Sequence, residues 1–160
     1  MKKVFAILLL PFILGLSGCS HNIIKWKQWN LRYESPEKIR KYRTESNAVL
    51  GYDNYNLAVD IEVVPLYEET DEFRADIKYA AKELALGLSF EKIKTGDFIP
   101  KVEKGFYVIG HDIDDDGEEH PAIIAVIINE YRNVAFEITI DCYNKNLEKG
   151  LAIVKSFEFY

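Results

Sequence analysis

The sequence predicts an α+β domain: a mainly antiparallel sheet with helices packed on both faces, which is an α/β/α sandwich. Several stretches alternate apolar and polar residues with the period of two that is typical of half-buried strands. Two stretches carry apolar residues at helical spacing, and runs of strands separate them. Residues 122–128 are continuously apolar, which indicates a central strand covered on both sides.

The first predicted strand covers residues 29–34, where aromatic and aliphatic residues alternate with polar ones. Pro36 ends it. The charged stretch 37–47 allows two interpretations, a short helical turn after Pro36 or a strand around residues 41–44. A further strand over residues 48–52 leads through an Asp-Asn turn into the regular alternation of residues 57–63, which Pro65 closes.

The clearest helix begins at Thr70, a suitable N-cap, and ends at Gly87, a natural C-terminal stop. Asp71 and Glu72 lie in the first turn, where the helix dipole favours negative charge. We expect one continuous helix, because its apolar residues keep the spacing of a single core-facing stripe. These residues are Phe73, Ile77, Ala80, Ala81 and Leu84.

The second half of the chain predicts a run of antiparallel strands followed by a helix. Its elements are a short strand at 90–94, a loop at 95–97, strands at 106–110, 122–128 and 134–142, a polar loop at 111–121 and a turn at 129–133. The helix begins near Asn144, with Leu147, Leu151 and Val154 as its buried stripe. Residues 156–160 add a final short strand or pack as a tail.

The N-terminus has the pattern of an export signal. Two lysines precede an apolar run, and Leu16-Ser17-Gly18-Cys19 follows it, as in a bacterial lipoprotein signal whose cysteine is acylated. The apolar run is too short for a membrane span. We therefore expect a signal peptide at 1–18, a lipidated Cys19 with a tether at 19–25, and one globular domain at 26–160. This predicts a cell-envelope location, on the outer membrane facing the periplasm, since Ser20 does not resemble an inner-membrane retention signal.

Composition bounds the partners of this domain. Of the 160 residues, 48% are hydrophobic and 13% aromatic, which fits one packed core and argues against disorder. The net charge is −6, and it is −8 without residues 1–18, which contain two lysines and no acid. Such an acidic domain is a poor candidate for nucleic acid or an anionic membrane surface. Membrane attachment is thus expected through the lipid alone, and the oligomeric state is open.

One motif carries metal chemistry. Asp112, Asp114 and Asp116 occupy positions 1, 3 and 5 of a calcium loop, and Gly117 follows at position 6. Position 12 is Ile123, and the flanks are strands, so this is no EF-hand. The simpler interpretation is a solvated hairpin tip in which Asp-Gly makes the turn. The alternative is a Ca²⁺-binding hairpin loop that Glu118 or Glu119 completes; no other cofactor is expected.

Other candidate groups are sparse. His111 and His120 flank the acidic loop and could face each other across the hairpin as transition-metal ligands, or be surface histidines. Cys142 shares the apolar face of its strand, so we expect a buried thiol with a raised pKa, and it has no disulfide partner if Cys19 is acylated. No Gly-x-Ser-x-Gly elbow or glycine-rich phosphate loop occurs.

Aromatic residues are frequent in the N-terminal third, and they predict either packing of helices onto the sheet or a binding groove for sugar or peptide. These residues are Trp26, Trp29, Tyr33, Tyr42, Tyr52, Tyr55 and Tyr67.

The layout resembles the Mog1/PsbP-like family, in particular its small bacterial lipoproteins. The likeness spans most of the mature chain and rests on the aromatic strand at 29–36, the strand at 57–63 before a helix, and the closing segment 151–157. It implies a non-catalytic binding or assembly factor with an envelope protein as partner, and it transfers no functional residue. The alternatives are a Ca²⁺-dependent module that uses the acidic hairpin and an envelope enzyme with an unrecognised site.

Overall fold

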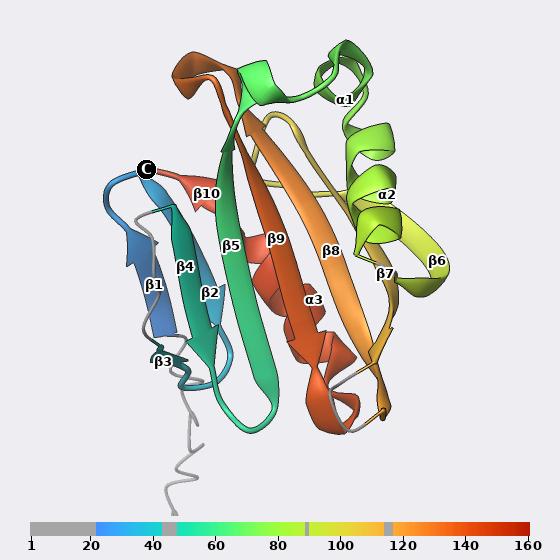
Figure 1. The fold of residues 1–160 in the computed structure, drawn as a ribbon. Helices are drawn as coiled ribbons and strands as arrows, with labels where there is room; N and C mark the ends of the chain where they lie inside the picture. Colours follow the sequence, from blue (N-terminus) through green and yellow to red (C-terminus); the bar gives the residue numbers. More distant parts are fainter. Residues whose placement is uncertain (1–21, 43–47, 89, 114–116) are drawn as a thin grey trace, which may run out of the picture.

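The fold is seen in a computed structural model, which describes residues 22–42, 48–88, 90–113 and 117–160. The predicted signal peptide and Cys19 lie outside these residues. A seven-stranded sheet has the order β3-β4-β5-β9-β8-β7-β6, and a three-stranded sheet has the order β1-β2-β10 (Figure 1). All the strand pairs are antiparallel, as the alternating patterns and short connections predicted. The α+β class is thereby confirmed.

The large sheet contains the longest strands. Its members are β3 (Arg40–Lys41), β4 (Val49–Asp53), β5 (Leu57–Pro65), β6 (Glu91–Phe98), β7 (Gly105–Ile113), β8 (Glu119–Asn129) and β9 (Val134–Cys142). The small sheet consists of β1 (Asn22–Trp26), β2 (Leu31–Ser35) and β10 (Glu158–Phe159). The helices are α1 (Asp71–Ala75), α2 (Ile77–Gly87) and α3 (Leu147–Ser156), with short 3₁₀ turns η1 (Leu66–Glu68), η2 (Glu130–Arg132) and η3 (Tyr143–Lys145). No helix among the described residues is both long and apolar enough to span a membrane.

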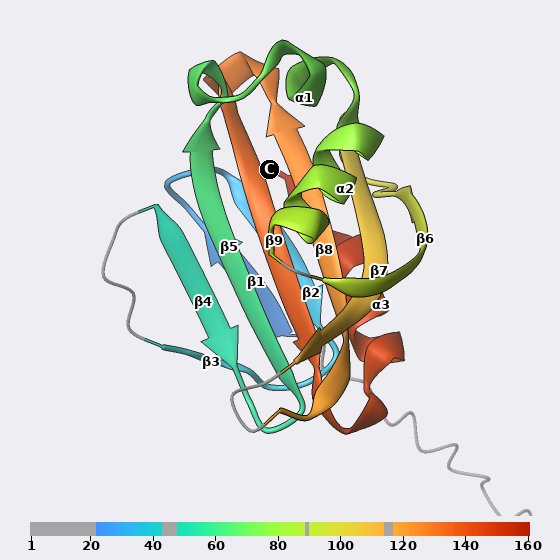
Figure 2. The same cartoon turned by 45° about the vertical axis from the view of Figure 1, so that its right-hand side comes forward.

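Helices cover both faces of the large sheet, as predicted. Helix α2 packs on β7 and β8 from one side, while α3 packs on β8 and β9 from the other and contacts β2 (Figure 2). Strand β8 is continuously apolar because each of its two faces packs into a different core. Ile123, Ala125 and Ile127 belong to the core under α3, whereas Ile124 and Val126 belong to the core under α2.

The strand expected at 29–34 and the final strand allowed within 156–160 are present as β2 and β10, but the sequence analysis foresaw neither β1 nor a separate small sheet. It completes the layer of α3, so that Ile24, Leu31 and Tyr33 join the same core as strand β5. Strand β1 begins at Asn22, inside the predicted tether, because Ile24 is buried while its neighbour Ile23 is 55% exposed. The ordered domain therefore starts earlier than residue 26, and Trp29 lies in the turn between β1 and β2.

Three other segments differ from their predictions. The expected single helix is broken at Asp76, whose extended backbone (φ −122°, ψ 100°) separates α1 from α2. Residues 95–97 belong to β6 instead of a loop, because Gly96 lets this strand lie against the Phe106 ring. The polar loop at 111–121 is shorter than expected, since β7 extends to Ile113 and β8 begins at Glu119.

Two stretches whose structure the sequence left open, residues 37–47 and 156–160, both contain strands. Within the described part of residues 37–47, Arg40–Lys41 forms β3, which agrees with the strand interpretation; residues 43–47 lie outside the described part. The C-terminal residues add β10. Helix α3 begins at Leu147, later than Asn144, and its buried face includes Gly150, Ile153 and Val154 beside the partly buried Leu147 and Leu151.

Candidate functional site

A hollow of about 590 Å³ opens at the end of the sandwich where the β1–β2 turn, η2, the β6–β7 turn and the C-terminus meet. Four aromatic rings line it: Trp29, Tyr131, Phe159 and Tyr160. Two acids and two bases add opposite charges to the same wall: Glu103, Lys104, Glu130 and Arg132. We call this hollow the Trp29 pocket.

The β1–β2 turn places Trp29 in the wall of the pocket. The backbone N–H groups of Trp29 and Asn30 donate to the carbonyls of Trp26 (3.0 Å) and Lys27 (3.3 Å). Asn30 takes the left-handed conformation (φ 52°) that Asn adopts more readily than most residues. The Trp29 ring packs edge-on against buried Phe136, with the ring centroids 6.0 Å apart. The aromatic wall is therefore fixed to the central strand β9.

Arg132 lines the pocket beside Trp29. Its guanidinium lies over the Trp29 ring, 5.9 Å from the centroid, and Nη1 donates to the Gln28 carbonyl at 2.8 Å. The 3₁₀ turn that presents it is capped by Asn129, whose side chain accepts from the Arg132 backbone N–H. Tyr131 in the same turn is 98% exposed. An exposed aromatic beside a positioned guanidinium is the residue pair that protein interfaces favour.

The remaining wall is held by polar contacts. Lys104 Nζ donates to Glu130 Oε1 (3.0 Å) and to the Arg74 carbonyl. The backbone N–H of Tyr160 donates to the Asn30 carbonyl at 2.9 Å, which fixes the C-terminus beside the turn. Among the described residues that line the pocket there is no Ser, Cys or His to act as a nucleophile or general base. The arrangement suits recognition of an amphiphilic ligand.

A second cluster lies at the opposite end of the sheet. Asp112, His120 and Asp141 each offer a ligand atom, and these atoms lie within 4.8 Å of one another. The strand register explains the meeting, because Asp112 pairs with His120, and Asp141 pairs with Ala122, two residues further along β8. Residues two apart in a strand share a face. The cluster therefore stands on three adjacent strands.

The histidine of this cluster is held tightly. Its side chain is only 10% exposed, and Nε2 lies 3.3 Å from Asp141 Oδ1. The ring packs on Tyr143 with a centroid distance of 4.7 Å, and Nδ1 is buried with no hydrogen-bond partner among the described residues. Burial raises the pKa of Asp141, and Asp112 adds to this, while His120 partly offsets it.

Two comparisons found no relative. No protein-family profile matches the chain, and no curated protein sequence matches it. Solved structures do resemble it, with TM-scores of 0.55–0.56. One is the Ran-binding protein Mog1p of Saccharomyces cerevisiae, at 11% identity over 88% of this chain and 96% of that one. Another is a cyanobacterial PsbP (CyanoP) from Synechocystis, at 11% identity over 91% of this chain and 96% of that one. A mutant of Mog1 aligns at 10% identity over 87% and 95% of the two chains.

The fold is Mog1/PsbP-like. Identities this low establish the architecture alone, which is the α/β/α sandwich that the sequence pattern predicted.

On this Mog1/PsbP-like fold, the structure describes two of the four predicted calcium ligands, Asp112 and Glu118. Asp112 lies in β7, paired with His120, and Glu118 is exposed between β7 and β8. Asp114 and Asp116 lie outside the described residues. Gly117 has the left-handed backbone (φ 82°) that a turn demands of glycine. Asp112 also lies in the cluster with His120 and Asp141, and the calcium loop stays a prediction.

The two histidines do not face each other across the hairpin. His111 pairs with Pro121 and Asp112 with His120, so His111 and His120 point to opposite faces. His111 Nδ1 instead lies 3.6 Å from Glu119 Oε1. The residue that sequence reasoning missed is Asp141. Its signal was its polar position in the alternation of β9, but only the register with β8 shows that it meets His120.

The prediction for Cys142 is confirmed, whereas the N-terminal aromatic residues lie in several different places. Cys142 is fully buried, and burial raises the pKa of its thiol to about 12, as its strand pattern predicted. Of the N-terminal aromatics, Trp29 lines the pocket, whereas Tyr33 is buried in the core and Tyr55 and Tyr67 are exposed elsewhere. The pocket takes its other rings from residues 131–160, which sequence reasoning left out.

Proposed function

We propose that the chain is a lipid-anchored, non-catalytic module of the bacterial cell envelope that binds a protein partner through the Trp29 pocket. The pocket carries the proposal, because it combines packed aromatic rings, the exposed Tyr131 and paired charges. One structural neighbour is a Ran-binding protein, which supports protein binding as a use of this fold; the partner here is an envelope protein.

Site-specific photo-crosslinking of the full chain in its native envelope tests this use of the pocket. A photoreactive residue at Tyr131 should crosslink one protein, and Arg132→Glu should reduce that product about tenfold or more by removing an interface anchor. A photoreactive residue at Phe98 is the matched control, since this ring is 54% exposed on the edge strand β6. Equal products from both positions, or none from Tyr131, would contradict the proposal.

The membrane attachment is proposed to pass through Cys19, which follows Leu16-Ser17-Gly18. The wild-type chain should incorporate a labelled fatty acid such as a palmitate analogue and sediment with outer membranes. Cys19→Ser should take up no label and appear in the soluble fraction. Cys142→Ser serves as the control, because that thiol is buried and should leave both readouts unchanged. Membrane retention of the unacylated Cys19→Ser chain would refute the anchor.

A metal-dependent role is the second candidate, favoured by the Asp112–His120–Asp141 cluster. A histidine nitrogen with two carboxylates suits Zn²⁺ better than Ca²⁺, which requires six to eight oxygen ligands. Titration of the metal-free chain with Zn²⁺ should release heat and raise Tm, since a ligand that binds the folded state stabilises it.

The two histidines distinguish the possible metal sites. His120→Ala should abolish the Zn²⁺ effect, and His111→Ala should retain it, because His111 points to the other face of the hairpin. Zinc binding that survives His120→Ala would rule out this cluster. A Ca²⁺ response that is independent of His120 would support the hairpin loop of Asp112, Asp114, Asp116 and Glu118 instead.

A further inference from the structure

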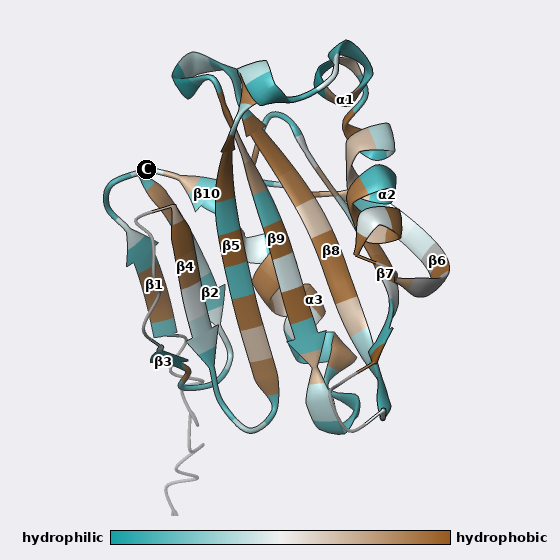
Figure 3. Ribbon diagram, viewed as in Figure 1, coloured by the Kyte–Doolittle hydropathy of each residue, from teal (hydrophilic) through white to brown (hydrophobic). Residues whose placement is uncertain are grey.

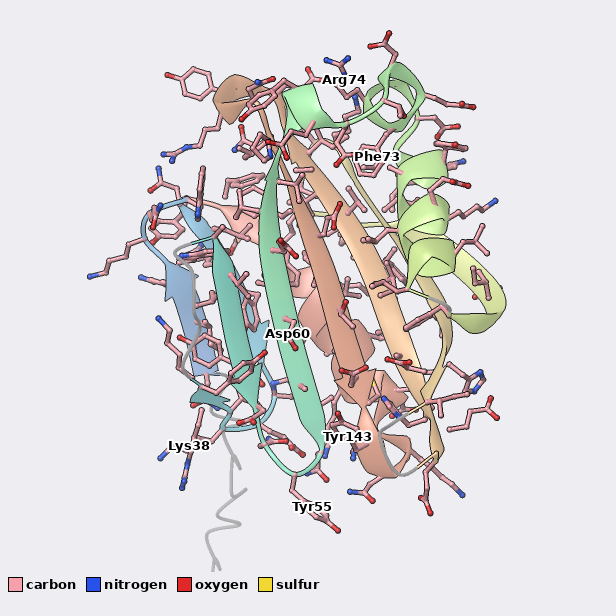
Figure 4. The ribbon with its side chains drawn as sticks, viewed as in Figure 1. Lys38, Tyr55, Asp60, Phe73, Arg74 and Tyr143 are labelled. Atoms are coloured by element: carbon pink, nitrogen blue, oxygen red, sulfur yellow. The ribbon has the colours of Figure 1, made fainter. Side chains whose placement is uncertain are left out.

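The end of the domain opposite the Trp29 pocket is the end at which the described chain begins. Asn22, the first residue of β1, pairs with Ser35, the last residue of β2. Lys38 and strand β3 follow directly in the chain. Lys38 and Tyr55 lie at this end of the molecule, and Arg74, whose carbonyl binds Lys104 of the pocket, lies at the other (Figure 4).

This end carries a cationic patch at the β3 edge of the large sheet, while the acidic β7–β8 hairpin lies at the same end, on the far side of β5 and β9. Lys38, Arg40 and Lys41 are all exposed, and the side chain of Tyr55 projects beside them with 85% exposure. Within the described residues, the three cations form no ion pair. We call these four residues the anchor-end patch.

A hollow of about 390 Å³ gives the patch a concave shape. Lys38, Arg40, Asp53, Asn54 and Tyr55 line it. Asp53 supplies its one acidic side chain and stands opposite Arg40 in the β3–β4 ladder. Two cations thus face a space large enough for a phosphate group, with an exposed phenol ring at its rim. Lysine and arginine attract anionic headgroups, and tyrosine favours the headgroup layer of a bilayer.

We propose that the anchor-end patch binds the anionic headgroups of the membrane that holds Cys19. The inference rests on the proposed lipid anchor. Two residues separate Cys19 from Asn22, so three Cα–Cα steps join them and the two Cα atoms lie at most about 11 Å apart. Such a short link holds the beginning of β1, and with it the patch, against the bilayer surface. The acyl chains supply the attachment, and the patch sets the orientation of the domain.

The orientation decides from which side a partner reaches the pocket. Strand β5 runs between the two ends of the sandwich (Figure 1), and its nine residues correspond to roughly 30 Å. A domain seated on its anchor-end patch therefore presents the Trp29 pocket to the aqueous side, away from the lipid. The partner that fits this placement is a soluble envelope protein or a domain that rises well above the membrane.

Fluorescence quenching on the acylated full chain tests the orientation. Tyr55→Cys and Tyr131→Cys each add one reactive thiol, because Cys19 is acylated and Cys142 is buried. The labelled proteins are reconstituted in vesicles of phosphatidylglycerol and phosphatidylcholine that contain a lipid with a nitroxide on its headgroup. We expect quenching at position 55 to be several-fold stronger than at position 131, and weaker in vesicles of phosphatidylcholine alone.

Charge reversal separates the patch from the anchor. Lys38→Glu, Arg40→Glu and Lys41→Glu together should lower the quenching at position 55 to the level at position 131. The same change at Lys82, Lys101 and Lys155, which are exposed elsewhere, should leave it unchanged. Equal quenching at the two positions, or no effect of the first triple variant, would overturn the proposal.

Mass spectrometry of the same sample establishes whether Cys19 carries acyl chains. An unacylated chain would overturn the orientation together with the anchor. The crosslinking at Tyr131 would still report on the pocket independently. An acylated chain that is quenched equally at both positions would overturn the orientation alone and leave the lipid-anchored binding module standing.

Discussion

At the scale of single residues, helix α3 packs closely on strand β9 at Gly150. Gly150 sits directly over Cys142, and a Cβ at this position would collide with the Cys142 Sγ atom and approach Ile123 Cδ1 at 3.1 Å. The absence of a side chain lets α3 lie close enough to bury Ile153 and Val154 completely. Gly150 is thus a requirement of packing, since its backbone is ordinary helix.

Gly150→Ala should destabilise the fold by about 1–3 kcal/mol, the usual cost of overpacking a filled core. Gly87→Ala is the matched control. Gly87 has nothing within 4 Å of an added Cβ, and this change should be neutral or stabilising by up to about 1 kcal/mol. Urea denaturation measures both.

A double variant tests the stated cause. In the double variant Cys142→Ala with Gly150→Ala the sulfur is gone. The double variant should therefore lose less stability than the sum of the losses in the two single variants. Strict additivity would show that Cys142 is not what limits the space at Gly150.

The metal cluster shows at the same scale where sequence reasoning ends. The buried thiol of Cys142 could be predicted, because the alternation of β9 alone places it on the core face. Asp141, its neighbour, could not be assigned to a site in this way. Its meeting with His120 depends on the β8–β9 register, and register is set by turn geometry and core packing over the whole sheet.

At the scale of elements, the unexpected break between α1 and α2 has an identifiable cause. Thr70 caps α1, its side chain accepting from the Phe73 N–H. Asp76 then caps α2 by accepting from the N–H groups of Lys78 and Tyr79. The apolar spacing of this segment fits one helix, which is why periodicity alone predicted no break. A mid-helix aspartate that can cap is the signal that was available.

Asp76→Ala should lower the free energy of unfolding by about 1 kcal/mol through loss of this cap. Asp76→Asn should lower the free energy of unfolding by only a few tenths of a kcal/mol, because an amide oxygen still accepts the same hydrogen bonds. Urea denaturation of the two variants decides the matter. A similar loss in both would mean that the negative charge at the N-terminus of α2 matters more than the cap.

The small sheet is the other element-level surprise. Its strands β1 and β2 are local in sequence, but β10 comes from the C-terminus, where two residues pair with Leu31 and Arg32. Five residues of β1 and two of β10 are too few to show a period. They form strands because the core under β5 leaves an apolar surface for Ile24 and Phe159 to cover. A local sequence pattern cannot show that packing against distant residues will make a segment a strand.

At the scale of the whole molecule, the two faces of the large sheet differ. The face under α3 and the small sheet is closed and apolar. On the other face, α2 covers only the half with β7 and β8, and β5 and β9 remain open with alternating polar residues (Figure 3). Four carboxylates stand on this open part: Asp60, Glu62, Glu137 and Asp141. Burial raises the pKa of three of them, Asp60, Glu137 and Asp141.

This open face predicts a stability that falls as pH rises. Burial, with the nearby Glu69 and Glu62, raises the pKa of Glu137 to about 7. Burial and Asp141 raise the pKa of Asp60 to about 6. Both groups keep protons in the folded state that the unfolded chain releases near pH 4, so unfolding releases protons between about pH 4 and pH 7. The destabilisation caused by charging Glu137 and Asp60 in the folded state is absent near pH 4 and complete above about pH 7.

Glu137→Gln tests this account in thermal melts between pH 5 and pH 8. Wild type should melt lower at pH 8 than at pH 5. The variant should melt higher than wild type at pH 8 and close to it at pH 5, because its amide is uncharged at both. After discounting for solvent, a contribution on the order of 1 kcal/mol corresponds to roughly 3–5 °C in Tm. Glu148→Gln, at an exposed position of α3, removes the same charge and should shift Tm equally at both pH values. A wild-type Tm that does not fall between pH 5 and pH 8 would show that water on the open face already solvates these carboxylates.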